Sequence, residues 1–321
     1  MQGRRFRKEF VIRRLTLSRR RLSCVAVAAA LLGLVAVVAS AWVVAPRPRD
    51  LSVRVEARPR LSGERPWPLS AITPNLRDAV IATEDERFYR HHGIDTIGLL
   101  RAIPYDIRHL SLRQGASTIP EQLGKLLYLD GYDHSPWLKL QAVVIALRLE
   151  ARYTREQILW AYLNSVYLGA GAYGVQAASE TYFGRPASRL DLAQASLLAG
   201  LIQAPTAYNP LVAPRAARSR QVYVLQAMVR NGYVTATEAS SALAAPLALR
   251  GKTPLPPITG ANFAARPNLQ VGQLVAGLVL IVGGVLLFFL RRLRPLPVWR
   301  LAAATAGLVG VLIVFGSYRG A

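Results

Sequence analysis

The sequence predicts a mainly α-helical protein in which one outer domain is joined to three transmembrane helices. Three observations lead to this fold class: three long stretches carry no charge, apolar residues elsewhere recur at helical spacing, and alternating strand patterns are scarce. The 321 residues are 52% hydrophobic and 18% charged. That composition excludes a disordered chain and is too apolar for an ordinary soluble domain.

The first uncharged stretch predicts a membrane anchor. Residues 1–23 form a tail with nine basic residues and one acid, and residues 24–45 carry no charge. A helix of about 22 residues crosses a hydrocarbon core of roughly 30 Å. The alternative is a cleaved signal peptide, because Ala39, Ser40 and Ala41 have the small-residue pattern of a cleavage site. The run is longer than a signal peptide's apolar core of about 7 to 15 residues, which favours the anchor.

Two further uncharged stretches, 271–290 and 301–318, predict a second and a third transmembrane helix. The loop between them, 291–300, is basic, so it and the N-terminal tail are expected in the cytoplasm, with residues 46–270 on the outer side of the membrane. A buried hairpin of a soluble core is the alternative, but the apolar residues run all round both segments. The hairpin either anchors the chain or docks another membrane protein through small residues: Gly272, Gly277, Gly283 and Gly284.

The part of the chain expected outside the membrane, residues 46–270, divides into three segments of different composition. Residues 46–70 are rich in Pro and Arg and predict a stalk. Thr73 and Pro74 predict a capped helix start, and Thr154 with Gln157 predicts a capping box. A helical domain is therefore expected over 71–244, followed by a Pro-rich linker, with helices at 138–152, 154–167, 190–202 and 215–231 and the linker at 245–270.

The net charge of the chain limits the classes of binding partner that are expected. The chain carries +22, and even without its basic ends the outer domain is cationic. Nucleic acid is disfavoured because no aromatic and basic recognition motif is present. Membrane lipid or a lipid that carries pyrophosphate suits a tethered cationic domain better. The lone Cys24 excludes a disulfide framework and Cys-based metal centres.

Two polar clusters could carry chemistry. Residues 84–93 end a helix with three carboxylates close to His91, where a carboxylate could have its pKa adjusted for acid or base work. Residues 115–125 place small residues and hydroxyls before Lys125, a composition that can hold phosphate. The structural alternatives are a solvated helix end and a capped helix start.

Together these segments resemble family 51 glycosyltransferases, the peptidoglycan transglycosylase domains of penicillin-binding proteins and monofunctional transglycosylases. The resemblance covers about 72–238. Its first motif is present in full as Glu84, Asp85, Phe88, His91 and Gly93. Several ordered motifs over such a length are far more specific than any one of them alone. Further matches are Arg101, Ser117, Thr118, Gln122, Lys125, Tyr162, Asn164, Tyr167, Gly174, Tyr182, Gly184 and Pro205.

The resemblance implies a lysozyme-like helical lobe with a small membrane-associated jaw, here about 99–113. It implies polymerisation of lipid II or a similar polyprenyl pyrophosphate-linked saccharide, with inversion. Glu84 matches the general base. The resemblance implies substrate binding by Asp85, Phe88, His91, Arg101, Ser117, Thr118, Gln122, Lys125, Lys139 and Asn164.

The third motif of the family departs here. Of its Arg-Lys-x-x-Glu pattern only Lys139 remains, with Leu138 and Ala142 at the arginine and glutamate positions. Pro120 and Glu121 are also unusual, as are Leu126 and Trp160. In one interpretation Glu121 supplies the missing carboxylate within about 6 to 10 Å of Glu84, and the protein is an active glycosyltransferase. In a second interpretation the protein binds a lipid-linked saccharide or a cell-wall synthase without turnover. In a third interpretation it is a hydrolytic relative of the family.

Other features complete the hypothesis. No penicillin-binding transpeptidase domain is expected, because the linker leads to the second transmembrane helix. No metal site is predicted from the residues, although a divalent cation such as Mg²⁺ would suit a pyrophosphate leaving group. His91 either touches substrate or fixes the motif loop. Glu150 and Glu156 are expected to pair with arginines on helix surfaces.

Overall fold

The computed structural model describes residues 19–58, 65–98, 117–129, 135–244 and 246–263, with side chains from residue 28 onward. The jaw at 99–113, Arg101 and the two C-terminal predicted transmembrane helices lie outside the described residues. Two compact units are distinguished, one made of 1–37 with 269–321 and the other of 38–268. The second unit contains the candidate site and is described below by itself.

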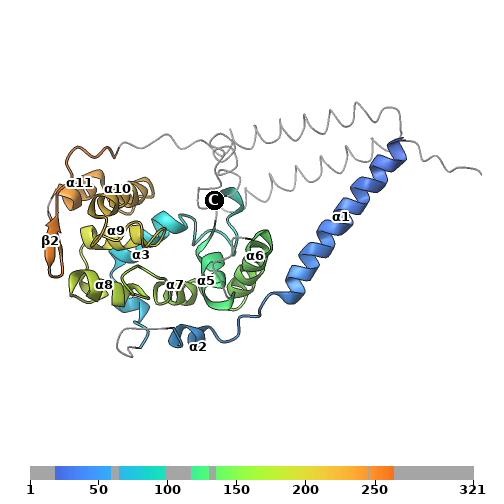
Figure 1. The fold of residues 1–321 in the computed structure, drawn as a ribbon, viewed down its shortest axis with the longest axis horizontal. Helices are drawn as coiled ribbons and strands as arrows, with labels where there is room; N and C mark the ends of the chain where they lie inside the picture. Colours follow the sequence, from blue (N-terminus) through green and yellow to red (C-terminus); the bar gives the residue numbers. More distant parts are fainter. Residues whose placement is uncertain (1–18, 59–64, 99–116, 130–134, 245, 264–321) are drawn as a thin grey trace, which may run out of the picture. The chain divides into compact units, whose positions relative to one another are not determined.

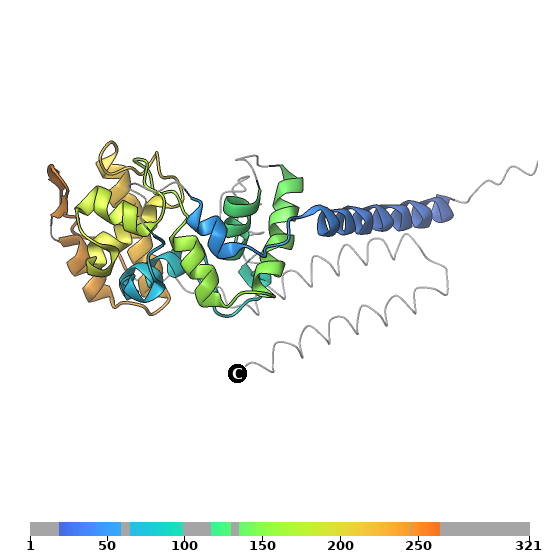
Figure 2. The ribbon, with the colours of Figure 1, turned by 90° about the horizontal axis from the view of Figure 1, so that it is seen from below.

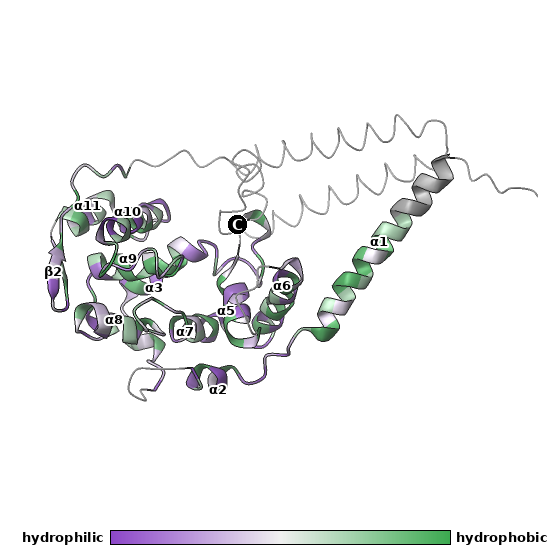
Figure 3. Cartoon of the chain, viewed as in Figure 1, coloured by the Kyte–Doolittle hydropathy of each residue, from purple (hydrophilic) through white to green (hydrophobic). Residues whose placement is uncertain are grey.

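The predicted anchor falls in helix α1, Arg19–Val44. Its described apolar side chains, Leu32 and Val43 among them, are exposed except that of Ala41. Much of the helix is coloured as hydrophobic in Figure 3. Within the described part of the chain, no helix is both long and apolar enough to cross a membrane. The end of α1 belongs to the second unit, where Arg148 donates to the backbone oxygens of Trp42, Ala45 and Pro46. These bonds satisfy carbonyl groups that a helix C-terminus leaves without intrahelical donors.

The predicted stalk is partly folded, which differs from the expectation for 46–70. Residues Leu51–Glu56 form the short helix α2, and Leu69–Ala71 form the 3-10 helix η2. Leu51 and Val55 are spaced four residues apart and are both buried, so α2 has an apolar face against the domain. Arg54 donates to Leu127 O at 2.8 Å. This helix could not be recognised from the sequence, because the segment is rich in Pro and Arg and only two positions of the helix face the core.

The larger helix group is built around α9, Leu192–Leu201, which packs against α3, Pro74–Glu84, and α10, Pro214–Arg230 (Figures 1 and 2). Every residue of α9 from Gln194 onward is buried, so this helix needs no polar face. A capping box of Asp191 and Gln194 fixes its start. α8, Val175–Phe183, η3, Ala187–Arg189, and α11, Ala236–Ala244, complete the group.

The second helix group consists of α5, Ile119–Tyr128, α6, Pro136–Glu150, and α7, Arg155–Leu163. Each begins at a hydroxyl cap, and the predicted capping box of Thr154 and Gln157 is confirmed. The cap predicted at Thr73 is not: α3 begins at Pro74 as expected, but the Thr73 side chain makes no capping bond. There the first amides bond to the backbone oxygen of Thr73 instead, as Leu76 N does at 3.1 Å.

The first part of the predicted linker is also folded. Leu247–Leu249 (β1) and Lys252–Leu255 (β2) form an antiparallel hairpin with an irregular register. Gly251 has φ +61°, a left-handed conformation that the tight turn requires and that glycine adopts without strain. Leu247, Leu249 and Leu255 are buried, so the hairpin belongs to the domain. Two very short strands give too little alternation to be recognised from sequence.

Candidate active site

Glu84 lies at the last position of α3, where Asp85 leaves the helix with φ −159° and ψ 72°. Its side chain is 11% exposed. Gln122 Nε2 of α5 donates to Glu84 Oε2 at 3.0 Å, and Gln122 Oε1 accepts from the Tyr162 hydroxyl at 2.6 Å. Arg220 Nη2 of α10 lies 4.0 Å from Glu84 Oε1. Three helices other than its own therefore fix the position of this carboxylate.

Burial raises the pKa of Glu84 above its ordinary value. The hydrogen bond from Gln122 and the charge of Arg220 act in the opposite direction, and the nearby Asp85 raises the pKa further. Loss of hydration is the dominant cause, because burial disfavours the charged form of a carboxyl group. A carboxylate with a raised pKa is a better proton acceptor than one in water, which suits general base catalysis.

Asp85 connects the end of α3 to the start of α5. Its Oδ1 lies 2.8 Å from His91 Nε2, and its Oδ2 accepts from Ile119 N at 2.9 Å. Both Asp85 and His91 are buried. A carboxylate at a helix N-terminus is stabilised by the unpaired amides and the helix dipole. Through Asp85, the loop 85–93 that follows α3 is thus connected to the start of α5.

Thr118 joins the same loop to α5. Its hydroxyl donates to Gly93 O at 2.7 Å and accepts from Glu121 N at 3.3 Å, so it caps the helix. Gly93 has φ +84°, and a Cβ there would lie 3.1 Å from the backbone carbonyl carbon of Ala146. The close approach to α6 and the left-handed backbone both require glycine at this position.

Glu121 is buried, with 2% of its side chain exposed, and pairs with Lys139 of α6. Lys139 Nζ also donates to Ser117 Oγ at 2.6 Å. Burial raises the pKa of Glu121, and the charge of Lys139 opposes that effect. Burial and the repulsion of Lys139 lower the pKa of Lys125. Glu121 therefore does not face solvent, and its sequence neighbour Gln122 binds Glu84.

Ala142 is fully buried where α6 packs against α5. The helices come close there, because a Cβ on Gly124 would lie 3.0 Å from Ile145 Cγ2 and 3.5 Å from Ala142 O. A glutamate at position 142 would have to fit into this tightly packed contact. In this chain the carboxylate next to Lys139 comes from α5.

Two further residues predicted for the site, Phe88 and Asn164, lie in the interior of the domain. Phe88 is fully buried. Asn164 is buried, and its amide accepts from Trp67 N at 2.7 Å and donates to the oxygens of Trp67 and Trp160 at 3.0 and 2.9 Å. Its hydrogen-bonding groups thus hold the segment before α3. Glu150 pairs with Arg155 at 3.2 Å, as predicted, and Arg155 also donates to the oxygens of Phe88 and His91.

Sequence reasoning missed Arg220. It follows Glu84 by more than a hundred residues, on a helix with several other arginines, so no local spacing singles it out. The only hint in the sequence was the presence of Tyr208 and Tyr223 near Arg220. In the structure, the guanidinium carbon of Arg220 lies 4.4 Å from the ring centroid of Tyr223 and 5.9 Å from that of Tyr208. Arginine near aromatic faces is common, and such a signal alone predicts no site.

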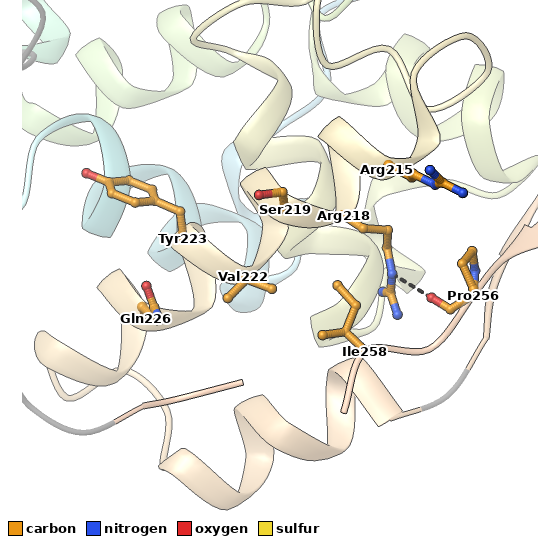
Figure 4. Close-up of a pocket in the computed structure, with 8 residues that line it drawn as sticks. All are labelled: Arg215, Arg218, Ser219, Val222, Tyr223, Gln226, Pro256 and Ile258. Atoms are coloured by element: carbon orange, nitrogen blue, oxygen red, sulfur yellow. Dashed lines mark hydrogen bonds between the residues drawn. The ribbon is translucent and has the colours of Figure 1, made fainter. Parts of the chain in front are cut away.

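A separate pocket of about 510 Å³ lies beside α10 and the segment after β2 (Figure 4). Arg218 points across it and donates to Pro256 O at 3.0 Å. The guanidinium also bonds to Gln221 Oε1 and Leu243 O, at 2.7 and 3.0 Å. The lining contains no carboxylate and is mainly apolar in character, so this pocket is not the place for base chemistry. The hydrogen bond from Arg218 to Pro256 O connects the segment after β2 to α10.

The described residues contain no group of three or more His, Cys, Asp or Glu side chains placed to hold a metal ion. The carboxylate of Glu121 is bound by Lys139, and that of Asp85 by His91 and Ile119 N. In the part of the chain that the structure describes, these two carboxylates are therefore already occupied by protein partners and do not fit a divalent cation site.

Sequence comparisons identify similar proteins. A profile described as Transglycosylase matches residues 56–229. A Cupriavidus necator protein described as a transglycosylase is 46% identical over 185 residues, which cover 57% of this chain and 78% of the relative. Penicillin-binding protein 1A of Escherichia coli is 41% identical over 170 residues, 53% of this chain. The match spans only about a fifth (20%) of that longer protein.

Among solved structures, penicillin-binding protein 1A from Haemophilus influenzae is 24% identical, with a TM-score of 0.35 and coverage of 60% of this chain and 18% of that one. The family profile covers more than half of the chain and includes α3, α5 and α7 in full and α10 up to its last residue but one. The chain therefore belongs to the transglycosylase family.

Proposed function

We propose that this protein is a membrane-bound glycosyltransferase that polymerises a lipid pyrophosphate-linked saccharide, lipid II or a similar donor, with inversion. The observation that carries the proposal is the Glu84 carboxylate, buried at the end of α3 and held by Gln122 and Arg220. The family supplies the class of reaction. The geometry supports a base at this position.

In the proposed reaction Glu84 removes the proton from an acceptor sugar hydroxyl. The hydroxyl oxygen bonds to the anomeric carbon of the donor, while the bond from that carbon to the pyrophosphate oxygen breaks. The electron pair of that bond leaves with the lipid pyrophosphate, and attack opposite to the leaving group inverts the configuration. A positioned general base contributes about 10² to 10⁴ in rate.

The leaving group needs positive charge and hydrogen-bond donors. Lys139, Lys125 and Ser117 supply these near the start of α5. We propose that Glu121 serves as the second carboxylate of the site, in place of the family's glutamate at position 142, by holding Lys139 against Ser117. Cationic donors aimed at developing negative charge are among the largest contributors to enzyme rates.

The membrane part of the proposal rests on the sequence. The uncharged run 24–45, the basic tail before it and the exposed apolar side chains of α1 support a tether. Residues 271–290 and 301–318 are proposed as the second and third transmembrane helices, with the domain on the outer side of a bacterial cytoplasmic membrane. A lipid-linked substrate would then lie in the same bilayer as the enzyme.

One observation favours a second candidate function. Ala142 provides no oxygen atom where the family has an acid. A protein with this change could bind a lipid-linked saccharide, or another cell-wall synthesis protein, without turnover. Losing one electrostatic stabiliser typically costs about a hundredfold to a thousandfold in rate, which slows an enzyme and does not abolish its activity.

Polymerisation of lipid II by the full chain in detergent tests the proposal. Wild type should form polymer, Glu84→Gln should lose at least about a hundredfold in rate because no base remains, and Glu121→Gln should lose a similar factor. Glu86→Gln is the matched control, because Glu86 is exposed and two residues from Glu84.

The outcomes separate the candidates. Polymer from wild type that is lost in both site variants supports an enzyme with a relocated carboxylate. Full activity in Glu121→Gln removes Glu121 from the mechanism. No polymer from wild type, with lipid II binding retained in wild type and Glu84→Gln, replaces the enzyme with a binding protein.

A further inference from the structure

Arg220 comes close to Glu84 because of how α9 and α10 pack. Gly200 of α9 lies against the stem of Arg220, since a Cβ at Gly200 would be 3.0 Å from Arg220 Cγ and 3.4 Å from Val224 Cγ2. A larger residue at position 200 would displace that stem. The stem of Arg220 thus packs against α9, and its guanidinium lies beside Glu84 at the end of α3.

Aromatic rings restrain the guanidinium. Arg220 Cζ lies 4.4 Å from the Tyr223 ring centroid and 5.9 Å from that of Tyr208, both within cation–π range. Only 11% of the Arg220 side chain is exposed, and its Nε is buried without a hydrogen-bond partner among the described residues. The charge is therefore poorly hydrated, and a nearby anion interacts with it more strongly than it would in water.

That anion is Glu84, with 4.0 Å between Arg220 Nη2 and Glu84 Oε1. Other elements bring different groups to the same carboxylate. α5 contributes the neutral Gln122, the loop after α3 contributes the negative Asp85, and α7 contributes the Tyr162 hydroxyl through Gln122. α9 has no ionisable side chain between Leu192 and Leu201. The positive charge acting on Glu84 thus comes from α10.

We propose that Arg220 is a positioning residue which holds Glu84 ionised and oriented as the base, with Tyr208 and Tyr223 holding Arg220 in turn. The proposal rests on the proposed function, because it assigns Arg220 to the base of that reaction. Arg220 acts through Glu84 and takes no part in bond making.

The sign of the effect on Glu84 follows from its surroundings. Burial favours the protonated form of Glu84, and Arg220 favours the ionised form. Removing the charge of Arg220 leaves burial and Asp85 opposed only by the hydrogen bond from Gln122, so the pKa of Glu84 rises further. A base that must be ionised then becomes active only at higher pH.

The experiment is the pH dependence of kcat/KM for lipid II polymerisation, from pH 5 to 9, for wild type and Arg220→Gln. The acid limb of this profile reports the base of the free enzyme. It should move upward by about one pH unit or more in Arg220→Gln, the size of effect that an opposite charge at this distance has on a carboxyl group. At a pH below the limb, Arg220→Gln should therefore be slower than wild type by roughly tenfold for each pH unit that the limb moves.

Three further variants separate electrostatics from structure. Arg230→Gln is the matched control, because Arg230 is exposed and lies 6.0 Å from the same Tyr223 ring. Its profile should match wild type. Arg220→Lys keeps the charge and should restore most of the position of the limb. Tyr223→Leu, which leaves Arg220 in place, should move the limb in the same direction by a smaller amount.

A structural role alone would lower the rate equally at all pH values and leave the limb in place, and that result would overturn the proposal. An equal movement of the limb in Arg230→Gln would overturn it as well. If wild type forms no polymer, the proposed function fails, but this inference is tested separately by titrating the ¹³C carboxyl resonance of Glu84, assigned through its loss in Glu84→Gln. An unchanged titration in Arg220→Gln would then reject it.

Discussion

At the scale of single residues, the site combines buried carboxylates with cations from other helices. Glu84, Ser117, Thr118, Gln122 and Lys139 follow from ordered motifs, and the structure brings them to the ends of α3 and α5. Their contacts were not predictable in the same way. Arg220 belongs to a distant helix, and Asn164 proves to bond to backbone groups of the framework. Motifs identify residue types, whereas contacts depend on how the helices pack.

Glu84 should reduce stability at neutral pH. Its folded pKa is raised by burial, so the folded state binds the proton more tightly than the unfolded chain, and stability falls as pH rises from the unfolded value through the folded one. Glu84→Gln resembles the protonated side chain and should unfold at a higher temperature than wild type at pH 7.5. The difference should shrink as pH is lowered toward 5.

Thermal unfolding of both proteins at several pH values measures this difference. Glu86→Gln serves as the comparison, because its side chain is exposed and should change the unfolding temperature little. A Glu84→Gln variant that is less stable than wild type at neutral pH would show that the contacts of Glu84 outweigh the cost of its burial.

At the scale of elements, sequence signals worked where a helix start has its own chemistry. The predicted capping box of α7 needs only Thr154 and Gln157, which are three residues apart. α2 and the β1–β2 hairpin were missed, because their burial comes from contacts with distant parts of the domain. Elements shorter than two helical turns contain too few residues to show a period.

The junction of the motif loop with α6 gives a prediction at this scale. Gly93→Ala and Gly232→Ala both place a Cβ on a left-handed backbone, at φ +84° and +73°, which costs roughly 1–2 kcal/mol. At Gly93 the added Cβ also meets the backbone of Ala146, whereas nothing lies within 4 Å at Gly232. Gly93→Ala should therefore lose more stability, and polymerisation as well, because Gly93 O accepts from Thr118.

Urea unfolding and the polymerisation assay compare the two glycine variants. Gly232→Ala should keep wild-type activity. Equal losses of stability in the two variants would mean that the loop moves away from α6 without cost, and that the close approach has no importance for the site.

At the scale of the whole molecule, the hypothesis of three transmembrane helices can be tested through cysteine. The chain contains Cys24 alone, so Cys24→Ala gives a background without thiols. In that background Ser240→Cys, exposed on α11, should react in intact cells with a membrane-impermeant maleimide. Arg294→Cys, in the predicted cytoplasmic loop, should react only after the membrane is permeabilised.

The labelling pattern decides between topologies. Reaction at both positions in intact cells would place the loop outside and reject the proposed second and third transmembrane helices. Protection at both positions in intact cells would place the domain inside, which would also remove access to an outer-leaflet substrate.

The sequence by itself determined the helical class, the capping box of α7 and the family, because periodicity, capping groups and motif spacing are local properties of the chain. It also indicated Glu121 as the candidate for the second carboxylate of the site, because Ala142 stands where the family has a glutamate. Only the tertiary structure decided that Glu121 pairs with Lys139, and that Arg220 rather than a motif residue supplies positive charge to Glu84. The physical reason is distance: charge and desolvation act through space, and helices α5, α6, α9 and α10 bring together side chains that lie far apart in the sequence.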